Sequence, residues 1–181
     1  MKSFAKILIL SGLMLSVLAC SKASTETLFA SQETQIENFL KNQLSANPDA
    51  YTVSNGGTQR LVLTEGSGDE LKSNGTLSFY WAGYVLTGSS LSASNLFATN
   101  SIDVAEDAGW DTEDTEAYTI RTMELSELVG ALRDGLTGVK GGQECIVLFS
   151  GKYGFSSKPL GTIPANAALA YHVWVESISN D

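Results

Sequence analysis

The chain has 181 residues, of which 43% are hydrophobic and 17% are charged, and its 20 acidic and 11 basic residues give a formal net charge of -9. This composition is typical of a globular protein, and the excess of acids without a run of Lys or Arg excludes binding along a phosphate backbone, so we expect no nucleic-acid partner. One His and two Cys are too few for the usual zinc, haem or iron-sulfur ligand sets, so we expect no metal and no cofactor.

The first nineteen residues have the pattern of a signal peptide. Lys2 and Lys6 form a short basic region before a stretch of 13 mostly apolar residues, from Ile7 to Ala19. This stretch is too short to cross a bilayer and fits the apolar region of a secretory signal. The stretch leads into Cys20, and the run Val-Leu-Ala-Cys resembles the lipobox of bacterial lipoproteins. This resemblance implies that Cys20 is lipidated and becomes the first residue of the mature chain; a plain secretory signal with a nearby cysteine is the alternative.

The lipobox resemblance also implies a location. It places the protein in the bacterial cell envelope, bound to a membrane through its N-terminal lipid, and the absence of Asp after Cys20 favours the outer membrane, facing the periplasm. The leaflet and the oligomeric state are left open. We expect three segments: a signal peptide at 1–19, a lipid anchor with tether and N-terminal helix at 20–50, and a single domain at 51–181.

A helix is expected soon after the anchor. Residues 21–28 are rich in Ser and Thr and read as a short tether. The apolar residues that follow recur with helical spacing and predict a helix from about Ser31 to Leu44, ended by Asn47-Pro48. The apolar residues on the expected face are Leu28, Phe29, Ile36, Phe39, Leu40 and Leu44.

From residue 50 onward the pattern is that of strands joined by turns. The run from Leu61 leads into a Gly-rich turn, and Thr76 to Leu86 is rich in β-forming residues. Leu125, Leu128, Val129 and Leu132 form one apolar stripe, which predicts a helix ending at Gly135. Further strands are expected around Tyr118, Ile120 and Met123, from Glu144 to Ser150, and from Leu169 to Ile178.

An acidic segment separates two of these strands. Residues 103–116 hold seven acids and no basic residue. A calcium loop needs alternating ligands around a central Gly and a terminal Glu, and this spacing lacks them. We therefore expect a solvated acidic insertion at about 97–117, and a partner surface on this insertion is a further hypothesis.

Cys145 and His172 could in principle act as a nucleophile and a base, but the sequence around each favours a structural role. Cys145 lies in the apolar run CIVLF and is expected to be a buried core residue rather than a reactive thiol. In the last strand, Tyr171 and Val173 alternate with His172, so they lie on the inner face and His172 on the more polar one. We expect His172 to be solvated or weakly paired rather than a ligand or general base.

The order of segments from Gly75 to Ile178 resembles FKBP-type peptidyl-prolyl isomerases. The run FYWAGYVLTGSSL resembles the family's hydrophobic-Tyr-x-Gly-x-x-x-x-Gly-x-x-Phe-Asp segment, and ELVGALRDGLTGVKGGQ resembles its helix and Gly-Gln turn. The ending YGFSSKPLGTIPANAALAYHVWVESI resembles the family's Ile-Pro-x-Asn-Ala-x-Leu-x-Phe pattern. The resemblance implies an α+β fold in which an FKBP-like antiparallel sheet wraps a short helix, here with an extra N-terminal helix.

The resemblance also implies an activity, the cis-trans isomerisation of X-Pro bonds in proline-containing polypeptides. Twisting an amide has a barrier of about 18 to 20 kcal/mol, yet no bond is made and no proton moves. An apolar cleft can accelerate this step by binding the twisted form best. A chain with almost no His, Cys or metal ligands suits such chemistry. A non-catalytic FKBP-like binding or chaperone module on the membrane is the alternative.

Eight residues stand at positions that form the family's cleft. Val129 stands where the family's backbone N–H donates to bound ligand, while Ser92 replaces its Asp, Leu132 its Trp floor and Phe155 its loop Tyr. These changes keep the cleft apolar and remove hydrogen-bonding groups, so we expect reduced activity and weak macrolide binding; Tyr118 or Ile120 would complete the wall. The eight residues are Trp81, Leu91, Ser92, Val129, Leu132, Phe155, Ile163 and Tyr171.

Overall fold

The structure is a computed structural model that describes the backbone of residues 2–155 and 157–180 and the side chains of residues 23–155 and 157–180. The expected signal peptide at 1–19 and the expected lipid attachment at Cys20 lie outside the described side chains.

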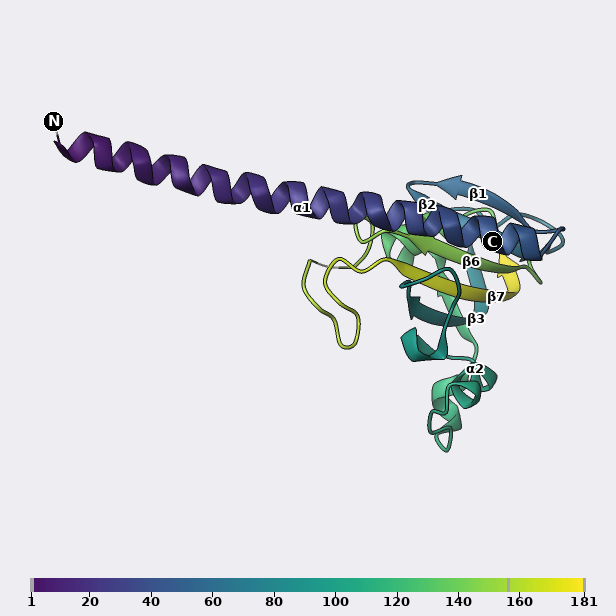
Figure 1. Ribbon diagram of the computed structural model, residues 1–181. Coiled ribbons are helices and arrows are strands. Elements are labelled where there is room, and N and C mark those ends of the chain that lie inside the picture. Colours follow the sequence, from purple (N-terminus) through teal and green to yellow (C-terminus); the bar gives the residue numbers. More distant parts are fainter. Residues whose placement is uncertain (1, 156, 181) are drawn as a thin grey trace.

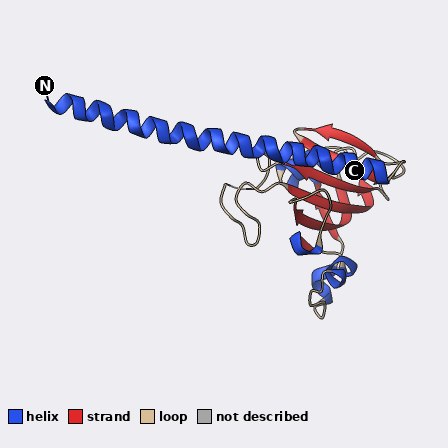
Figure 2. Cartoon of the chain, in the orientation of Figure 1, coloured by secondary structure: helices blue, strands red, loops and turns tan. Residues whose placement is uncertain are grey.

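A helix-covered antiparallel sheet forms the body of the molecule (Figures 1 and 2). Its helices are α1 (Lys2–Ala46), α2 (Ile102–Asp107) and α3 (Gly130–Leu136), and 3-10 turns lie at Ala93–Asn95, Thr115–Tyr118 and Leu125–Glu127. Its strands are β1 (Tyr51–Asn55), β2 (Thr58–Thr64), β3 (Thr76–Val85), β4 (Leu96–Thr99), β5 (Arg121–Glu124), β6 (Glu144–Phe149) and β7 (Leu169–Ser179).

Helix α1 is much longer than the sequence predicts. It ends at Ala46, close to the expected end, but it is helical from Lys2, so the expected tether at 21–28 is wrong. The physical reason lies in the sequence from residue 23 to residue 46, which contains no Gly or Pro to interrupt the helical hydrogen bonds. Among the residues that the structure describes, no helix is both long enough and apolar enough to span a membrane.

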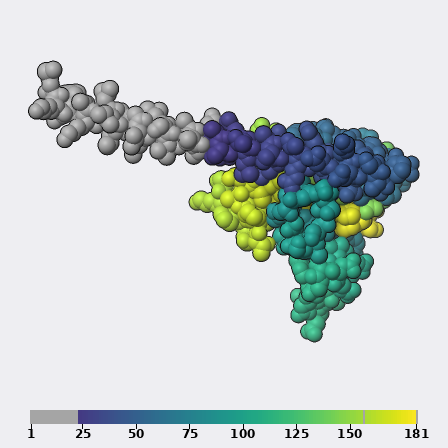
Figure 3. Space-filling model, viewed as in Figure 1, coloured from purple at the N-terminus to yellow at the C-terminus, as the bar shows by residue number. Residues whose placement is uncertain are grey.

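The C-terminal half of α1 packs on the outer face of the sheet (Figure 3). Ile36, Phe39 and Leu40 are buried there, and Phe39 is completely covered. Burying each such side chain stabilises the fold by about 1.5 to 3 kcal/mol. Leu28, which the helical pattern placed on the same face, is exposed and makes no such contribution. The sheet residues beneath the helix are Leu61, Ile146, Leu148 and Ala170.

The described strands form a seven-stranded sheet in the order β1-β2-β6-β7-β3-β4, in which β5 also pairs with β3. All its pairings are antiparallel. Strand β3 has neighbours on both sides, since β7 lies along its full length on one side while β4 and β5 share the other side. Successive residues of β3 and β7 point to opposite faces, so these two strands carry side chains for both the inner core and the outer face.

Strand β1 was not predicted and is held by a tight hairpin to β2. Asn55 pairs with Thr58 across the turn, and the two residues between them, Gly56 and Gly57, both have positive φ, 58° and 85°. A two-residue turn of this kind requires positive φ at both positions, which glycine adopts without strain. The Asn-Gly-Gly run was therefore the sequence signal for this hairpin.

Helix α3 covers the inner face and is positioned by residues of β2 and β6. Arg60 of β2 is buried, and its Nη1 donates to the carbonyls of Gly135 and Thr137 over 2.8 and 2.7 Å. These bonds satisfy carbonyls that would otherwise lack partners at the end of the helix. A Cβ at Gly135 would lie 2.4 Å from Cγ1 of Val147, so only glycine allows the helix to lie this close to β6.

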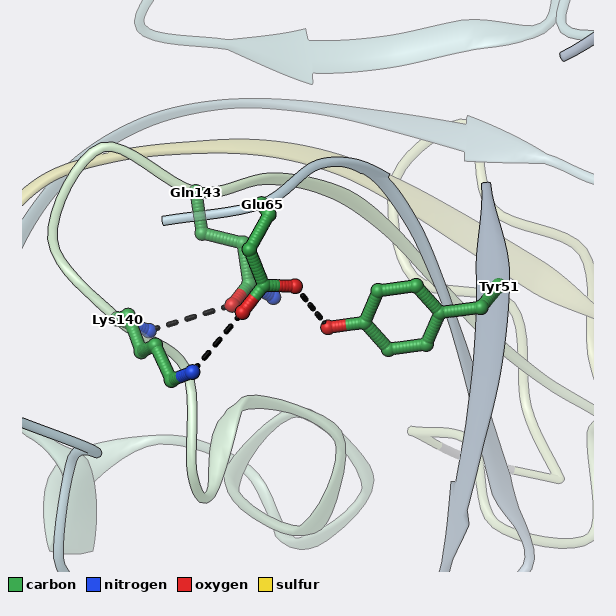
Figure 4. A network of polar contacts seen from close by, with 4 residues as sticks. All are labelled: Tyr51, Glu65, Lys140 and Gln143. Atoms are coloured by element: carbon green, nitrogen blue, oxygen red, sulfur yellow. Dashed lines mark hydrogen bonds and ion pairs between the residues drawn. The ribbon is translucent and has the colours of Figure 1, made fainter. Parts of the chain in front are cut away.

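A polar network joins β1, the end of β2 and the turn before β6 (Figure 4). The Tyr51 hydroxyl donates to Oε2 of Glu65, and Lys140 Nζ lies 2.9 Å from Oε1 of Glu65. The Lys140 backbone N–H donates to Oε1 of Gln143. The bond from Tyr51, and to a lesser extent that from Lys140, holds the pKa of the Glu65 carboxyl below its usual value. Charged Glu65 therefore links strand β1 to the turn that precedes β6.

The acidic segment differs from its expected limits. Residues 96–99 form β4 and pair with β3, so the insertion starts after Asn100 rather than near residue 97. It contains α2 and the 3-10 turn at 115–118, and it projects away from the sheet (Figure 1). The strand expected around Tyr118, Ile120 and Met123 is confined to β5, and the helix expected after residue 124 is divided into a 3-10 turn and α3.

The surroundings of Cys145 match the expectation, whereas those of His172 differ in part. Cys145 is completely buried in the core, as predicted, and burial raises the pKa of its thiol to about 12. His172 is not solvated: its side chain is 19% exposed, its Nε2 lies 2.8 Å from Oε1 of Glu144, and its ring packs on Trp174 with centroids 4.0 Å apart. Burial lowers the pKa of His172, against the opposing effect of Glu144.

Candidate functional site

An apolar cavity of about 240 Å³ lies on the inner face of the sheet. Strands β3 and β7 form one wall, and α3 with the turn that precedes it forms the other. Its lining is almost entirely aliphatic or aromatic, which is the usual character of a site for an apolar ligand group. The lining residues are Phe79, Trp81, Met123, Glu127, Leu128, Val129, Leu132, Leu136, Phe155, Tyr171 and Val173.

Tyr171 of β7 is the centre of an aromatic cluster at this wall. Its ring centroid lies 5.7 Å from that of Trp81 and 6.4 Å from that of Phe155, both of which line the cavity. Phe149 stacks on Tyr171 at 6.0 Å, and Phe97 of β4 meets it edge-on at 5.7 Å. These contacts fix the Tyr171 ring from several sides. Burial also raises the pKa of its hydroxyl, so the group is neutral throughout the physiological range.

The opposite wall combines aliphatic side chains with one backbone donor. Leu132 and Leu136 project from α3, and Val129, which is 43% exposed, precedes the helix. Because the first N–H groups of a helix have no partner within the helix, the Val129 segment offers donors at the cavity. The Val129 N–H makes no hydrogen bond with a backbone carbonyl of the described residues.

One carboxylate lies among the described lining residues. Glu127 lines the cavity, but its Oε2 accepts a hydrogen bond from the backbone N–H of Glu124 over 3.1 Å. The Glu124 side chain makes the reciprocal bond, which completes a capping box at residues 124–127. The charge is thus held at the rim by the turn, and the interior of the cavity is left apolar.

The loop between β6 and β7 brings Phe155 to the cavity and is anchored on α1. Gln32, 8% exposed, accepts a hydrogen bond at Oε1 from the Gly151 N–H and donates from Nε2 to the Asn166 carbonyl, both over 2.8 Å. A Cβ at Gly151 would lie only 2.0 Å from the Asn166 carbonyl oxygen. One side chain of the N-terminal helix therefore holds the two ends of the loop together, with glycine permitting the close approach.

Comparison with solved structures identifies the architecture. No protein-family model matches the sequence, and no curated protein matches it. FkpA from Escherichia coli superposes with a TM-score of 0.56 at 16% identity, over 94% of this chain and 70% of its own. A peptidyl-prolyl cis-trans isomerase from Pseudomonas syringae superposes with a TM-score of 0.58 at 15% identity, over 86% of this chain and 96% of its own. The N-terminal domain of FKBP42 from Arabidopsis thaliana superposes with a TM-score of 0.53 at 14% identity, over 73% of this chain and 94% of its own. The chain has an FKBP-like fold.

The FKBP-like fold brings most of the predicted site residues together. Trp81, Val129, Leu132, Phe155 and Tyr171 all line the cavity. These residues come from β3, the start of α3, the β6–β7 loop and β7, so they are widely separated in sequence and meet only in the folded chain. Their shared position makes the cavity the candidate site of this FKBP-like domain.

The other predicted residues lie elsewhere. Ile163 is buried beside a small cleft next to the cavity, which it shares with Phe155. Leu91 packs against residues of the outer face, and the Ser92 hydroxyl contacts that of Ser94, so neither lines the cavity. The sequence between β3 and β4 is longer than the expected spacing allows, and sheet pairing resumes only at residue 96.

The structure therefore corrects the register of this segment of the FKBP-like domain. The side chain that contacts the Tyr171 ring from β4 is Phe97. Leu91, which was expected to form this part of the wall, does not reach it. The next residue is Ala98, so no carboxylate follows that ring. The remaining wall comes from Met123 rather than from Tyr118 or Ile120.

Sequence reasoning also missed several residues at or near the cavity. Phe79 shares the strand face of Trp81, so alternation in β3 was an available signal. Met123 was assigned to a strand without a role, and Glu127 lies three residues after Glu124, the spacing of a capping box, although the first residue of that motif is usually Ser or Thr. No local pattern marks Gln32, because its partners are 119 and 134 residues away.

Proposed function

We propose that this chain is a peptidyl-prolyl cis-trans isomerase of the bacterial cell envelope, anchored through lipid on Cys20 and acting on proline-containing polypeptides. The observation that carries the proposal is the aromatic, nearly apolar cavity at the inner face of an FKBP-like fold. Such a cavity accepts a proline ring and excludes water from the amide next to it. A water-free site favours the twisted amide, whose polarity is lower than that of the planar form.

The residues of the cavity have distinct roles in this proposal. Trp81, Phe155 and Tyr171 contact the two faces and the edge of the proline ring, and Leu132 forms the apolar floor. The Val129 N–H donates to a carbonyl that flanks the rotating bond, which fixes one side of the peptide while the other turns. No proton transfer is required, so the site needs no group with a pKa near neutrality.

The proposed rate is reduced because apolar residues stand at three positions where the family's cleft has hydrogen-bonding side chains. Position 155 is Phe rather than Tyr, position 132 is Leu rather than Trp, and position 98 is Ala. A hydrogen bond made only in the transition state contributes about 1 to 3 kcal/mol, which corresponds to about one to two powers of ten in rate. These same absences favour a second candidate function, in which the cavity holds extended polypeptide segments without catalysis.

The test is cis-to-trans isomerisation of a short X-Pro peptide by the full chain, measured alongside suppression of aggregation of an unfolded protein. We expect catalysis in the full chain and a loss of about tenfold in kcat/KM for Trp81→Leu and for Phe155→Leu. Trp110→Leu is the matched control, since Trp110 is an exposed tryptophan of the acidic segment outside the cavity. Absence of catalysis with retained suppression of aggregation would replace the isomerase by the binding module.

A further inference from the structure

A second cavity lies on the opposite face of the same two strands. It has a volume of about 510 Å³ and is bounded by β3, β7 and the start of the acidic segment. Alternation along the strands separates the two sites: Trp81 and Val173 form one register pair and line the apolar cavity, while Tyr80 and Trp174 form the adjacent pair and line the second one. We call this second cavity the outer groove.

Three aromatic side chains line the outer groove and are held in place by their surroundings. Trp174 packs on the His172 ring at 4.0 Å, and His172 is in turn held by Glu144. Tyr118 donates its hydroxyl hydrogen to the Asp111 carbonyl over 3.0 Å. Tyr80 extends from β3, where it pairs with Trp174 of β7. All three residues are partly exposed, so part of each aromatic side chain is accessible to a ligand in the groove.

Two carboxylates share the outer groove with these rings. Asp103 and Glu176 both line it and are exposed, and neither forms an ion pair with any described residue. No basic side chain lines the groove. The adjoining segment adds further negative charge, since residues 103–116 contain seven acids and no base. The electrostatic potential of the groove therefore favours cations and disfavours anions.

We propose that the outer groove binds the cationic side chain of Lys or Arg within a basic segment of a partner polypeptide. Aromatic ring faces attract ammonium and guanidinium groups, and carboxylates at the rim add ionic hydrogen bonds to the same groups. A purely apolar side chain would leave the carboxylates unused, and an anion would be repelled. This binding does not depend on isomerase activity, because the apolar cavity lies on the other face of the sheet.

The test is nuclear magnetic resonance of the tryptophan indole N–H groups in the full chain. The chain contains three tryptophans, one in each relevant place: Trp81 in the apolar cavity, Trp174 in the outer groove and Trp110 outside both. The probe is a proline-free peptide of Gly and Ser with two Lys residues, and its matched partner has norleucine in place of Lys. We expect the Lys peptide to shift the Trp174 resonance and leave Trp81 unchanged, and the norleucine peptide to shift neither.

Charge and ring variants locate the interaction. Asp103→Asn combined with Glu176→Gln is expected to weaken binding of the Lys peptide by about threefold to tenfold, and Tyr118→Leu by a similar factor. The control is Glu33→Gln combined with Glu37→Gln, which makes the same change of net charge on α1, away from the groove, and is expected to leave the affinity unchanged. Equal weakening by the control pair would show unspecific attraction to the acidic chain and would overturn the site.

Two further outcomes would also overturn the proposal. An equal shift of Trp174 by the norleucine peptide would make the groove an apolar site. n-Butylammonium reproduces the Lys side chain without the peptide. If it bound with the same affinity as the Lys peptide, the ligand of the groove would be a small amine rather than a polypeptide. Because the peptides contain no proline, none of these outcomes depends on whether the apolar cavity is an isomerase site.

Discussion

The side-chain oxygen of Asn100 accepts a hydrogen bond from the backbone N–H of Trp81 over 2.6 Å. On this side of β3, pairing with β5 extends to Phe79 and pairing with β4 begins at Ala82, so the backbone between them lacks a strand neighbour. The Asn100 amide fills the gap, since its Nδ2 also donates to the carbonyls of Phe79 and Thr119. One buried side chain thus completes the sheet directly behind Trp81 and closes the base of the acidic segment.

Replacement of Asn100 is therefore expected to be strongly destabilising. Asn100→Ala removes three hydrogen bonds made by a buried side chain, to the N–H of Trp81 and to the carbonyls of Phe79 and Thr119, and we expect a loss of about 2 to 4 kcal/mol in the free energy of unfolding. Urea denaturation followed by far-ultraviolet circular dichroism measures this loss.

Asn95→Ala is the matched control for this change. The Asn95 amide makes a hydrogen bond to the Thr87 hydroxyl in an exposed loop, where water can replace the lost partner. We expect a loss below about 1 kcal/mol. Equal losses for the two variants would contradict the role assigned to Asn100.

Gln32 provides a second prediction, which concerns the loop that carries Phe155. Gln32→Leu keeps the approximate size of the side chain but removes both bonds that hold Gly151 and Asn166 together. We expect a loss of about 1 to 2 kcal/mol in stability and faster amide hydrogen exchange in residues 151–166. Under the proposed function, kcat/KM for the X-Pro peptide also falls, because Phe155 is less well positioned.

The control for Gln32 comes from the next turn of the same helix. Gln35→Leu removes one hydrogen bond from α1 to the Leu86 carbonyl, outside the loop. We expect unchanged exchange in residues 151–166 for this variant. If Gln32→Leu also left the exchange unchanged, the loop would be held by contacts other than this side chain.

The parts of the fold that were predictable have strong local signals. The alternation in β3 and β7, the Gly-Gln turn before β6 and the helical face of Ile36, Phe39 and Leu40 all depend on residues near one another in sequence. They were sufficient to predict an antiparallel sheet with packed helices, and the FKBP-like fold was implied by the resemblance of three sequence stretches to that family. The start of α1 was missed because a tether and a helix can have the same Ser- and Thr-rich composition when no Gly or Pro is present.

The parts of the site that were missed depend on distant contacts. The identity of the ring beside Tyr171 depends on where pairing resumes after the loop following β3, and spacing alone selected Leu91 instead of Phe97. His172 was expected to be solvated or weakly paired because it lies on the more polar face of its strand; it is paired with Glu144 from β6, and the ring of Trp174 packs on it. Only tertiary structure brings these groups together.

A third prediction concerns the hydroxyl that position 155 lacks. Phe155→Tyr adds one polar atom to a side chain that is 36% exposed, so the fold should tolerate it. If the cavity acts on X-Pro bonds, a hydroxyl near the rotating carbonyl adds one hydrogen bond, and we expect kcat/KM to rise by about three- to tenfold. Tyr153→Phe is the reciprocal control, because Tyr153 belongs to the same loop but does not line the cavity; it should leave kcat/KM unchanged.

His172 gives a prediction about stability and pH. Burial lowers its pKa in the folded chain below the ordinary value of 6.5, and the unfolded chain has that ordinary value. As pH falls through 6.5 the unfolded chain binds a proton that the folded chain does not, so folding stability decreases. The contribution of neutral His172 is fully present above pH 6.5 and is lost progressively as pH falls toward the lower, folded-state pKa.

The variant that isolates this effect is His172→Gln, which keeps a hydrogen-bonding group next to Glu144 without a titrating ring. His172 is the sole histidine of the chain, and histidine is the side chain that ordinarily titrates between pH 5 and 7. The pKa of Glu65 is held below its usual 4.5, so that carboxylate stays charged in this range. We therefore expect the unfolding midpoint in urea to fall between pH 7 and pH 5 in the natural chain and to change less in His172→Gln. Parallel pH profiles for the two proteins would mean that His172 accepts its proton equally well in the folded and unfolded chains, and that Glu144 fully offsets the effect of burial.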